Sequence, residues 1–148
     1  MSRKLILLIC LSTVTYLSYR IFFTPNYKST FPFSKADNIE LIYYDKPLEG
    51  YSYLTKFKDV PVKKRLQLSD IDKEKIFKIL YRENTIIKSS GACFNPNHAL
   101  LFKNKKDTIG IIEICIECSQ IRATDGITLP TIGESIINNL DDFFKSKE

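Results

Sequence analysis

The chain has 148 residues and a formal net charge of +5, and 26% of its residues are charged. Three of its 22 Lys and Arg residues are Arg3, Lys4 and Arg20, which leaves 19 against 17 Asp and Glu in the rest of the chain. This nearly balanced remainder excludes the clustered basic face of a nucleic-acid-binding domain, and the length fits a single domain.

Residues 1–23 are expected to form a signal or anchor segment. A basic lead at residues 2–4 precedes an apolar run over residues 5–23. That run is close to the roughly 20 apolar residues that a membrane-spanning helix needs, if Arg20 extends its charge to the interface. Basic flanks stay on the cytoplasmic side of a membrane. The pattern predicts an uncleaved single-pass anchor in the inner membrane, with the rest of the chain extracytoplasmic, in the periplasm.

Two other arrangements of the N-terminus fit the sequence less well. Residues 13–15, Thr-Val-Thr, match poorly the small-residue site at which a secreted protein loses its signal peptide. Residues 7–10, Leu-Leu-Ile-Cys, loosely resemble a lipoprotein cleavage box, but the apolar run before them is short and continues past Cys10. We therefore prefer the anchor to a secreted form or a lipoprotein.

The segments that follow are predicted from composition and periodicity. Residues 24–38 are expected to form a linker, because they contain two prolines and show no sustained period. Strands are expected at residues 39–44, 51–57 and 85–88, which are rich in β-branched or aromatic side chains. The basic cluster at residues 63–65 is expected to lie in a solvated loop.

Two amphipathic helices are predicted from their N-terminal caps and their apolar spacing. The first begins at Ser69, where Ser69 and Asp72 form a capping box before apolar residues at helical spacing. The second follows Pro130, with Thr131 and Glu134 as its capping box. The first helix carries no side chains whose pattern points to chemistry.

A β-hairpin is predicted in the second half of the chain. Apolar runs at residues 99–102 and 109–115 flank a polar tip, which is typical of two antiparallel strands joined by a short turn. We expect the turn to be centred between Lys105 and Lys106. Both faces of the two runs are largely apolar, so the hairpin should be central in its sheet and covered on both sides.

This register predicts which residues of the hairpin lie together. His98 faces Glu113 and shares one face of the hairpin with Cys115, because side chains alternate along a strand. Extended further, the same register places Cys93 opposite Cys118. Opposed residues are about 4.5–5.5 Å apart at Cβ, so a small adjustment would allow a disulfide.

The cysteines and the single histidine allow four chemical interpretations. We favour a Cys93–Cys118 disulfide, because an exported domain is expected to be oxidised. Zinc bound by Cys93, His98, Cys115 and Cys118 is an alternative, since Cys115-x2-Cys118 can form a tight knuckle. A third interpretation is inert packing in the core. The fourth is catalysis, with Cys115 as nucleophile, His98 as base and Glu113 as orienting carboxylate.

Residues 93–98 (Cys-Phe-Asn-Pro-Asn-His) and 114–118 (Ile-Cys-Ile-Glu-Cys) together resemble a group of small, uncharacterised bacterial exported and lipoprotein-like proteins. The group has a Cys-aromatic-x-Pro segment followed by Ile-Cys-x-x-Cys. The likeness covers residues 69–148, and Asn97 departs from it where the group carries arginine. The resemblance implies a small exported domain, and it implies no mechanism because the group has no assigned activity.

These observations predict one α+β domain over residues 39–148: a small antiparallel sheet with a central hairpin and two packed helices, behind an N-terminal hydrophobic anchor. We expect membrane contact through residues 5–23, no nucleic-acid partner, no cofactor, and a structural or interaction role with a protein partner that the sequence does not specify. The alternative is a zinc-dependent or thiol-dependent enzyme that uses His98, Glu113 and Cys115.

Overall fold

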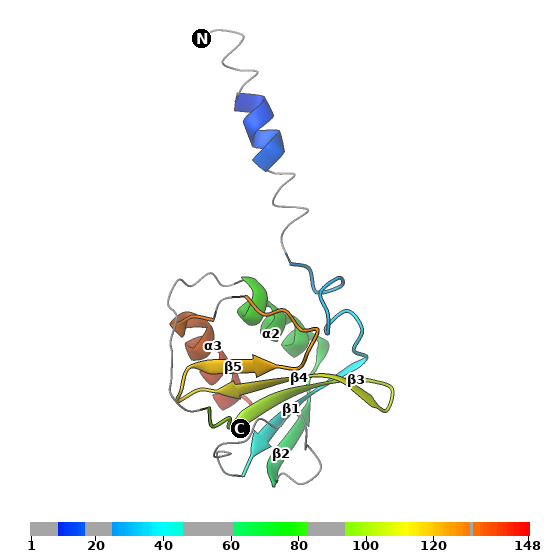
Figure 1. Cartoon of the computed structure of the whole chain (residues 1–148), viewed down its shortest axis with the longest axis vertical. Coiled ribbons are helices and arrows are strands. Elements are labelled where there is room, and N and C mark those ends of the chain that lie inside the picture. Colours follow the sequence, from blue (N-terminus) through cyan, green and yellow to red (C-terminus); the bar gives the residue numbers. More distant parts are fainter. Residues whose placement is uncertain (1–8, 17–24, 46–60, 83–93, 131) are drawn as a thin grey trace.

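The computed structural model describes residues 9–16, 25–45, 61–82, 94–130 and 132–148 (Figure 1). The predicted strands at residues 51–57 and 85–88 lie outside these ranges, as do Cys93 and Thr131.

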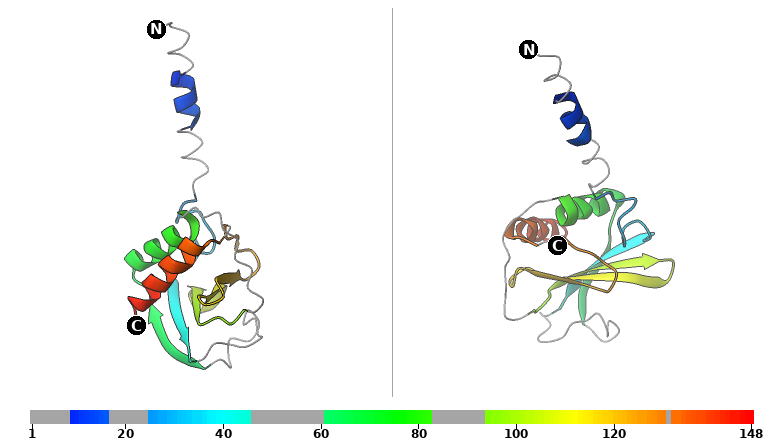
Figure 2. Two further views of the ribbon diagram at one scale, coloured as in Figure 1. Left: turned by 90° about the vertical axis from the view of Figure 1, so that its left-hand side faces the viewer. Right: turned by 45° about the horizontal axis from the view of Figure 1, so that its top comes forward.

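Within the described residues, five antiparallel strands form one sheet in the order β2-β1-β3-β4-β5. The strands are β1 (Asn38–Tyr44), β2 (Val62–Gln67), β3 (His98–Asn104), β4 (Asp107–Cys115) and β5 (Gln120–Ala123). Helices α2 (Asp70–Arg82) and α3 (Glu134–Lys145) lie side by side on one face of this sheet (Figure 2). The predicted α+β class is therefore confirmed, with the β3–β4 hairpin in the interior of the sheet and two helices packed on it.

The main core fills the space between the helices and the sheet. Its members include Phe33, Ile39, Leu41, Tyr43, Ile76, Phe77, Leu80, Leu100, Phe102, Ile112, Ile136, Leu140, Phe143 and Phe144. Side chains alternate along each strand, so the opposite face carries a second buried cluster, made of Ile42, Tyr44, Ala99, Leu101 and Ile111. The central strands are thus buried on both faces, as their apolar runs predict.

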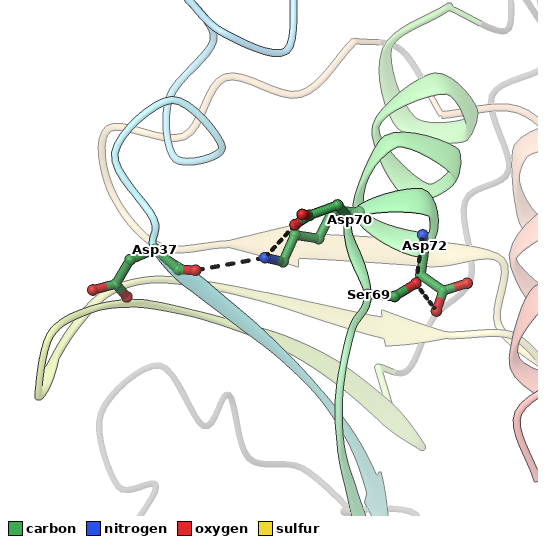
Figure 3. A network of polar contacts seen from close by, with 5 residues as sticks. Asp37, Ser69, Asp70 and Asp72 are labelled. Atoms are coloured by element: carbon green, nitrogen blue, oxygen red, sulfur yellow. Dashed lines mark hydrogen bonds and ion pairs between the residues drawn. The ribbon is translucent and has the colours of Figure 1, made fainter.

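Helix α2 begins at the cap that the sequence predicts (Figure 3). The Asp72 main-chain N–H donates to Ser69 Oγ at 3.2 Å, and the Ser69 hydroxyl donates to the Asp72 carboxylate at 2.7 Å. Lys73 Nζ lies 3.0 Å from the Asp70 carboxylate and donates to the main-chain oxygen of Asp37 at 3.5 Å. The first turn is therefore capped by Ser69 and also joined to the start of β1.

Helix α3 begins differently from the prediction. Its N-cap is Gly133, which has an extended backbone and no side-chain capping hydrogen bond. Glu134 is the first residue of the helix, whereas the predicted capping box placed it at the third. The prediction of that box was wrong, and the acidic side chain of Glu134 instead lies at the positive end of the helix dipole.

Residues 63–65 lie in edge strand β2 and not in the expected loop. The charges of these residues made the segment resemble a solvated loop in the sequence. Basic side chains are common on edge strands, where they hinder pairing with the strands of other molecules. Lys64 lies at one of the half-buried positions of the strand. Its Nζ donates to the main-chain oxygens of Lys147 at 2.7 Å and Glu148 at 2.6 Å. This strand therefore also anchors the residues that follow α3.

Residues 25–37, most of the expected linker, fold against the domain. Phe33 is buried, and its ring centroid lies 4.8 Å from that of Phe102 and 5.2 Å from that of Phe77. Tyr27 adds a second contact, 5.6 Å from the Phe77 ring. This part of the chain therefore supplies a large side chain to the main core.

Residues 9–16 are helical, and the apolar side chains of Ile9, Leu11, Val14 and Tyr16 on this helix are exposed. Cys10, on the same helix, is a free and exposed thiol. Within the described ranges, none of the helices combines the length and the apolar character needed to cross a membrane. The predicted segment 1–23 lies partly outside those ranges.

Candidate functional site

A β-bulge sets the register of the β3–β4 hairpin. At the tip, Asn104 pairs with Asp107, as the predicted turn requires. Between Phe102 and Lys103 the register shifts by one residue, so that Phe102 pairs with Gly110. A slip of one residue moves every later β4 side chain to the other face of the sheet, which changes the predicted site.

Two other segments of the chain approach β4 closely at Gly110, beside the bulge. A Cβ atom on Gly110 would lie 2.9 Å from Ile127 Cδ1 and 3.3 Å from Pro32 Cβ. The absence of a side chain lets residues 25–37 and the segment after β5 close over the sheet at this point. The register is therefore tied to packing from distant parts of the chain.

The predicted pairing of His98 with Glu113 was wrong. His98 pairs with Ile114, and Glu113 pairs with Ala99. Because side chains alternate, His98 lies on the face covered by the helices, whereas Glu113 and Cys115 lie on the opposite face. The sheet thus separates the histidine from the other two members of the expected catalytic group.

Cys115 and Cys118 form a disulfide across the β4–β5 turn, with their Cα atoms 5.4 Å apart. This pairing replaces the predicted partner of Cys118, which was Cys93, a residue outside the described ranges. The turn brings the two sulfurs together: Ser119 adopts a positive φ of 50°, and its N–H donates to the Ile116 carbonyl at 3.0 Å. Extrapolation of the β3–β4 register toward Cys93 did not take account of this second, tighter turn.

The two cysteines of this disulfide have different surroundings. Cys115 is the last residue of β4 and is 1% exposed, whereas Cys118 lies in the turn and is partly exposed. The main-chain N–H of Cys118 donates to Cys115 Sγ at 3.2 Å. One sulfur is therefore held in the interior beside a hydrogen-bond donor, and the other belongs to a residue that solvent can reach.

Glu113 is completely buried, the one charged side chain so placed among the residues that the structure describes. Its partner across the strands is Arg122 of β5. The Arg122 guanidinium carbon lies 4.1 Å from the centre of the Phe94 ring, a cation–π contact. Glu113, Arg122 and Cys115 share one face, so the buried carboxyl group, the arginine and the disulfide occupy the same end of the sheet.

His98 belongs to an aromatic cluster on the other face. Its ring stacks on that of Phe144 with centroids 4.4 Å apart, and Tyr43 lies edge-on at 5.0 Å. Burial lowers the pKa of His98 to about 4, against smaller opposing effects from the carboxylates of Glu148 and Asp141. A neutral imidazole with so low a pKa is a weak base near pH 7, which disfavours the catalytic role considered for His98.

The described ranges contain no group of three or more His, Cys, Asp or Glu side chains that could hold a metal ion. The zinc alternative requires Cys93, His98, Cys115 and Cys118 in one place. Two of these thiols are joined in a disulfide, and His98 faces away from them. Cys93 lies outside the described residues, so this arrangement gives the zinc alternative no support.

A separate pocket of about 330 Å³ lies between residues 26–28 and the first turns of α2. Tyr27 and Phe77 contribute aromatic surface to it, and its charged lining residues are Lys28, Asp70, Glu74 and Lys78. Glu74 and Lys78 form an ion pair at 2.9 Å. The positive and negative side chains that line the pocket offset each other. The lining therefore favours neither anionic nor cationic ligands.

No protein-family model, no curated protein and no solved structure matches the chain. The resemblance seen at residues 93–98 and 114–118 stays a prediction.

Proposed function

We propose that the chain is a membrane-anchored extracytoplasmic domain that acts as a structural or interaction module. The observation that carries the proposal is the Cys115–Cys118 disulfide. Disulfides persist in oxidising compartments such as the periplasm and are rare in the reducing cytosol. An oxidised cysteine pair therefore favours export of the folded domain.

The N-terminal sequence supports the anchor. Residues 9–16 form a helix whose apolar side chains are exposed, and they lie within the apolar run of residues 5–23. Exposed apolar helices usually contact a membrane or a partner. The basic residues before the run favour an orientation with the N-terminus in the cytoplasm. A single-pass anchor of residues 5–23 in the inner membrane accounts for both features.

The distribution of polar groups favours a module over an enzyme. The alternative activity needs His98, Glu113 and Cys115 on one face, and β-strand alternation divides them. Glu113 and Cys115 are buried, which restricts access of a substrate to either group.

Expression of the full chain with a C-terminal alkaline phosphatase in a bacterial host tests the proposal. The enzyme is active only outside the cytoplasm, because its own disulfides must form. We expect phosphatase activity, and we expect the fusion to stay in the membrane pellet after washing at alkaline pH. Soluble cytoplasmic protein with inactive phosphatase would overturn the proposal.

A pair of matched variants separates membrane anchoring from nonspecific association of exposed apolar side chains with the membrane. Leu11→Lys with Val14→Lys places two charges in the apolar run, each costing about 2.5–3.5 kcal/mol at the centre of a membrane helix. These substitutions should release the fusion from the membrane. Ile71→Lys changes an even more exposed apolar residue at the start of α2 and should leave the fusion in the pellet.

A further inference from the structure

We propose that the Cys115–Cys118 disulfide is a thiol–disulfide exchange site, which accepts two electrons from a dithiol of a protein or peptide partner. This inference goes beyond the role as a module, and it does not depend on the membrane anchor. It rests on the position of the bond in the fold and on the difference between its two sulfurs.

The bond contributes little to holding the fold together. Only two residues separate the cysteines, and a cross-link stabilises a chain less when the loop that it closes is short. The turn is held independently by the Ser119–Ile116 hydrogen bond and by the β4–β5 ladder, in which Cys115 pairs with Gln120. Ile121 of β5 also packs against the main core. The sheet can therefore keep its form when the bond opens, as an exchange site requires.

The surroundings of the two sulfurs select which one is attacked. Exchange proceeds by attack of a thiolate on one sulfur of the disulfide, and access decides which sulfur reacts. Cys118 is partly exposed, whereas Cys115 is 1% exposed. An incoming thiolate therefore reaches Cys118, and Cys115 becomes the leaving group.

The leaving sulfur already has a hydrogen-bond donor. The Cys118 N–H lies 3.2 Å from Cys115 Sγ. Hydrogen bonds to an anion favour its charged form, so the donor stabilises the thiolate that Cys115 becomes. Burial of Cys115 disfavours that negative charge, and the donor offsets part of this cost. The short turn therefore leaves Cys118 accessible to an attacking thiolate and places a hydrogen-bond donor on the departing Cys115 sulfur.

The reaction balances with a dithiol as the reductant. One deprotonated thiol of the partner attacks Cys118 Sγ, the Cys115–Cys118 bond breaks, and Cys115 leaves as a thiolate that takes up a proton. The second thiol of the partner, once deprotonated, attacks the partner's own sulfur in the mixed disulfide. It releases Cys118 as a thiolate, which is protonated in turn. The partner loses two electrons and two protons and becomes a disulfide, and the chain gains both thiols. A second disulfide-bearing molecule restores the oxidised form by the reverse steps.

The test uses the full chain in detergent, with Cys10→Ser and Cys93→Ser in every sample to remove the other thiols. A reduced dithiol peptide is incubated with glutathione disulfide, with and without a catalytic amount of this protein. We expect the protein to speed formation of the peptide disulfide at least tenfold. Cys118→Ser should abolish the acceleration. No acceleration over the uncatalysed reaction would overturn the proposal.

Mixed disulfides identify the attacked sulfur. Reduced glutathione is added to the oxidised parent protein, the reaction is quenched by alkylation, and peptide mapping should find the mixed disulfide on Cys118 at least tenfold more often than on Cys115. Equal amounts on the two cysteines would contradict the assignment. A second measurement keeps both Cys115 and Cys118. The circular dichroism spectrum of the parent protein is recorded before and after reduction with dithiothreitol. An unchanged spectrum with a mass gain of two hydrogens supports exchange, and loss of the fold on reduction marks the bond as structural and overturns it.

Discussion

The buried position of His98 predicts a specific dependence of stability on pH. The pKa of His98 is about 4 in the folded chain against an ordinary value of 6.5. Because the unfolded chain binds the proton more readily, the free energy of unfolding falls as the pH falls from 6.5 toward 4. At about 1.4 kcal/mol per pKa unit, the full difference is about 3 kcal/mol, of which about 2 kcal/mol should be lost by pH 5.

His98→Phe isolates this contribution from those of the carboxylates. A phenyl ring can keep the stacking on Phe144 and cannot take a proton. Urea unfolding of both proteins at pH 7.5 and pH 5 should show that the wild type loses about 2 kcal/mol more than His98→Phe. His98 is the only histidine, so its NMR titration can be followed without assignment. A His98 pKa near 6.5, or parallel pH profiles for the two proteins, would refute the reasoning.

Three further predictions concern packing and capping, each measured by urea unfolding of the full chain. Phe33→Ala should cost about 3–5 kcal/mol, because the ring is buried in the main core, and Phe31→Ala, at a half-exposed position, should cost clearly less. Ser69→Ala should cost about 1 kcal/mol through loss of the α2 cap, whereas Ser69→Asp should retain most of the stability. Gly110→Ala should cost about 1–3 kcal/mol by overpacking, and less in an Ile127→Val background, which removes the methyl group nearest to the new Cβ. Equal costs in the two backgrounds would show that this contact is not the cause.

The parts of the fold that were predicted correctly depend on residues close together in the chain. The cap at Ser69 needs Asp72, three residues later, and the apolar spacing of α2 repeats within each turn. The tip of the β3–β4 hairpin was also predicted correctly, because a short polar loop fixes the nearest pair, Asn104 and Asp107. Strand β2 was missed because its basic residues at an edge lack the apolar alternation of a half-buried strand.

The candidate site was predicted in composition but not in arrangement. The group of Cys93, Cys115, Cys118, Glu113 and His98 was predicted from residue types, spacing and an expected hairpin register. Its division by the sheet follows from one bulge, and the bulge lies beside Gly110, against which distant segments pack. Neither the contact of Arg122 with Phe94 nor its position opposite Glu113 has a local signal in the sequence.

By itself, the sequence determined the α+β class, the start of α2 and the tip of the central hairpin, because hydrophobic period, capping and turn chemistry act over a few residues. Only the tertiary structure decided the strand register, the burial of Phe33 and the faces on which His98 and Cys115 lie. These features depend on contacts between segments far apart in the chain. A strand has a period of two residues, so one extra residue at the bulge reversed the face of every β4 side chain beyond it.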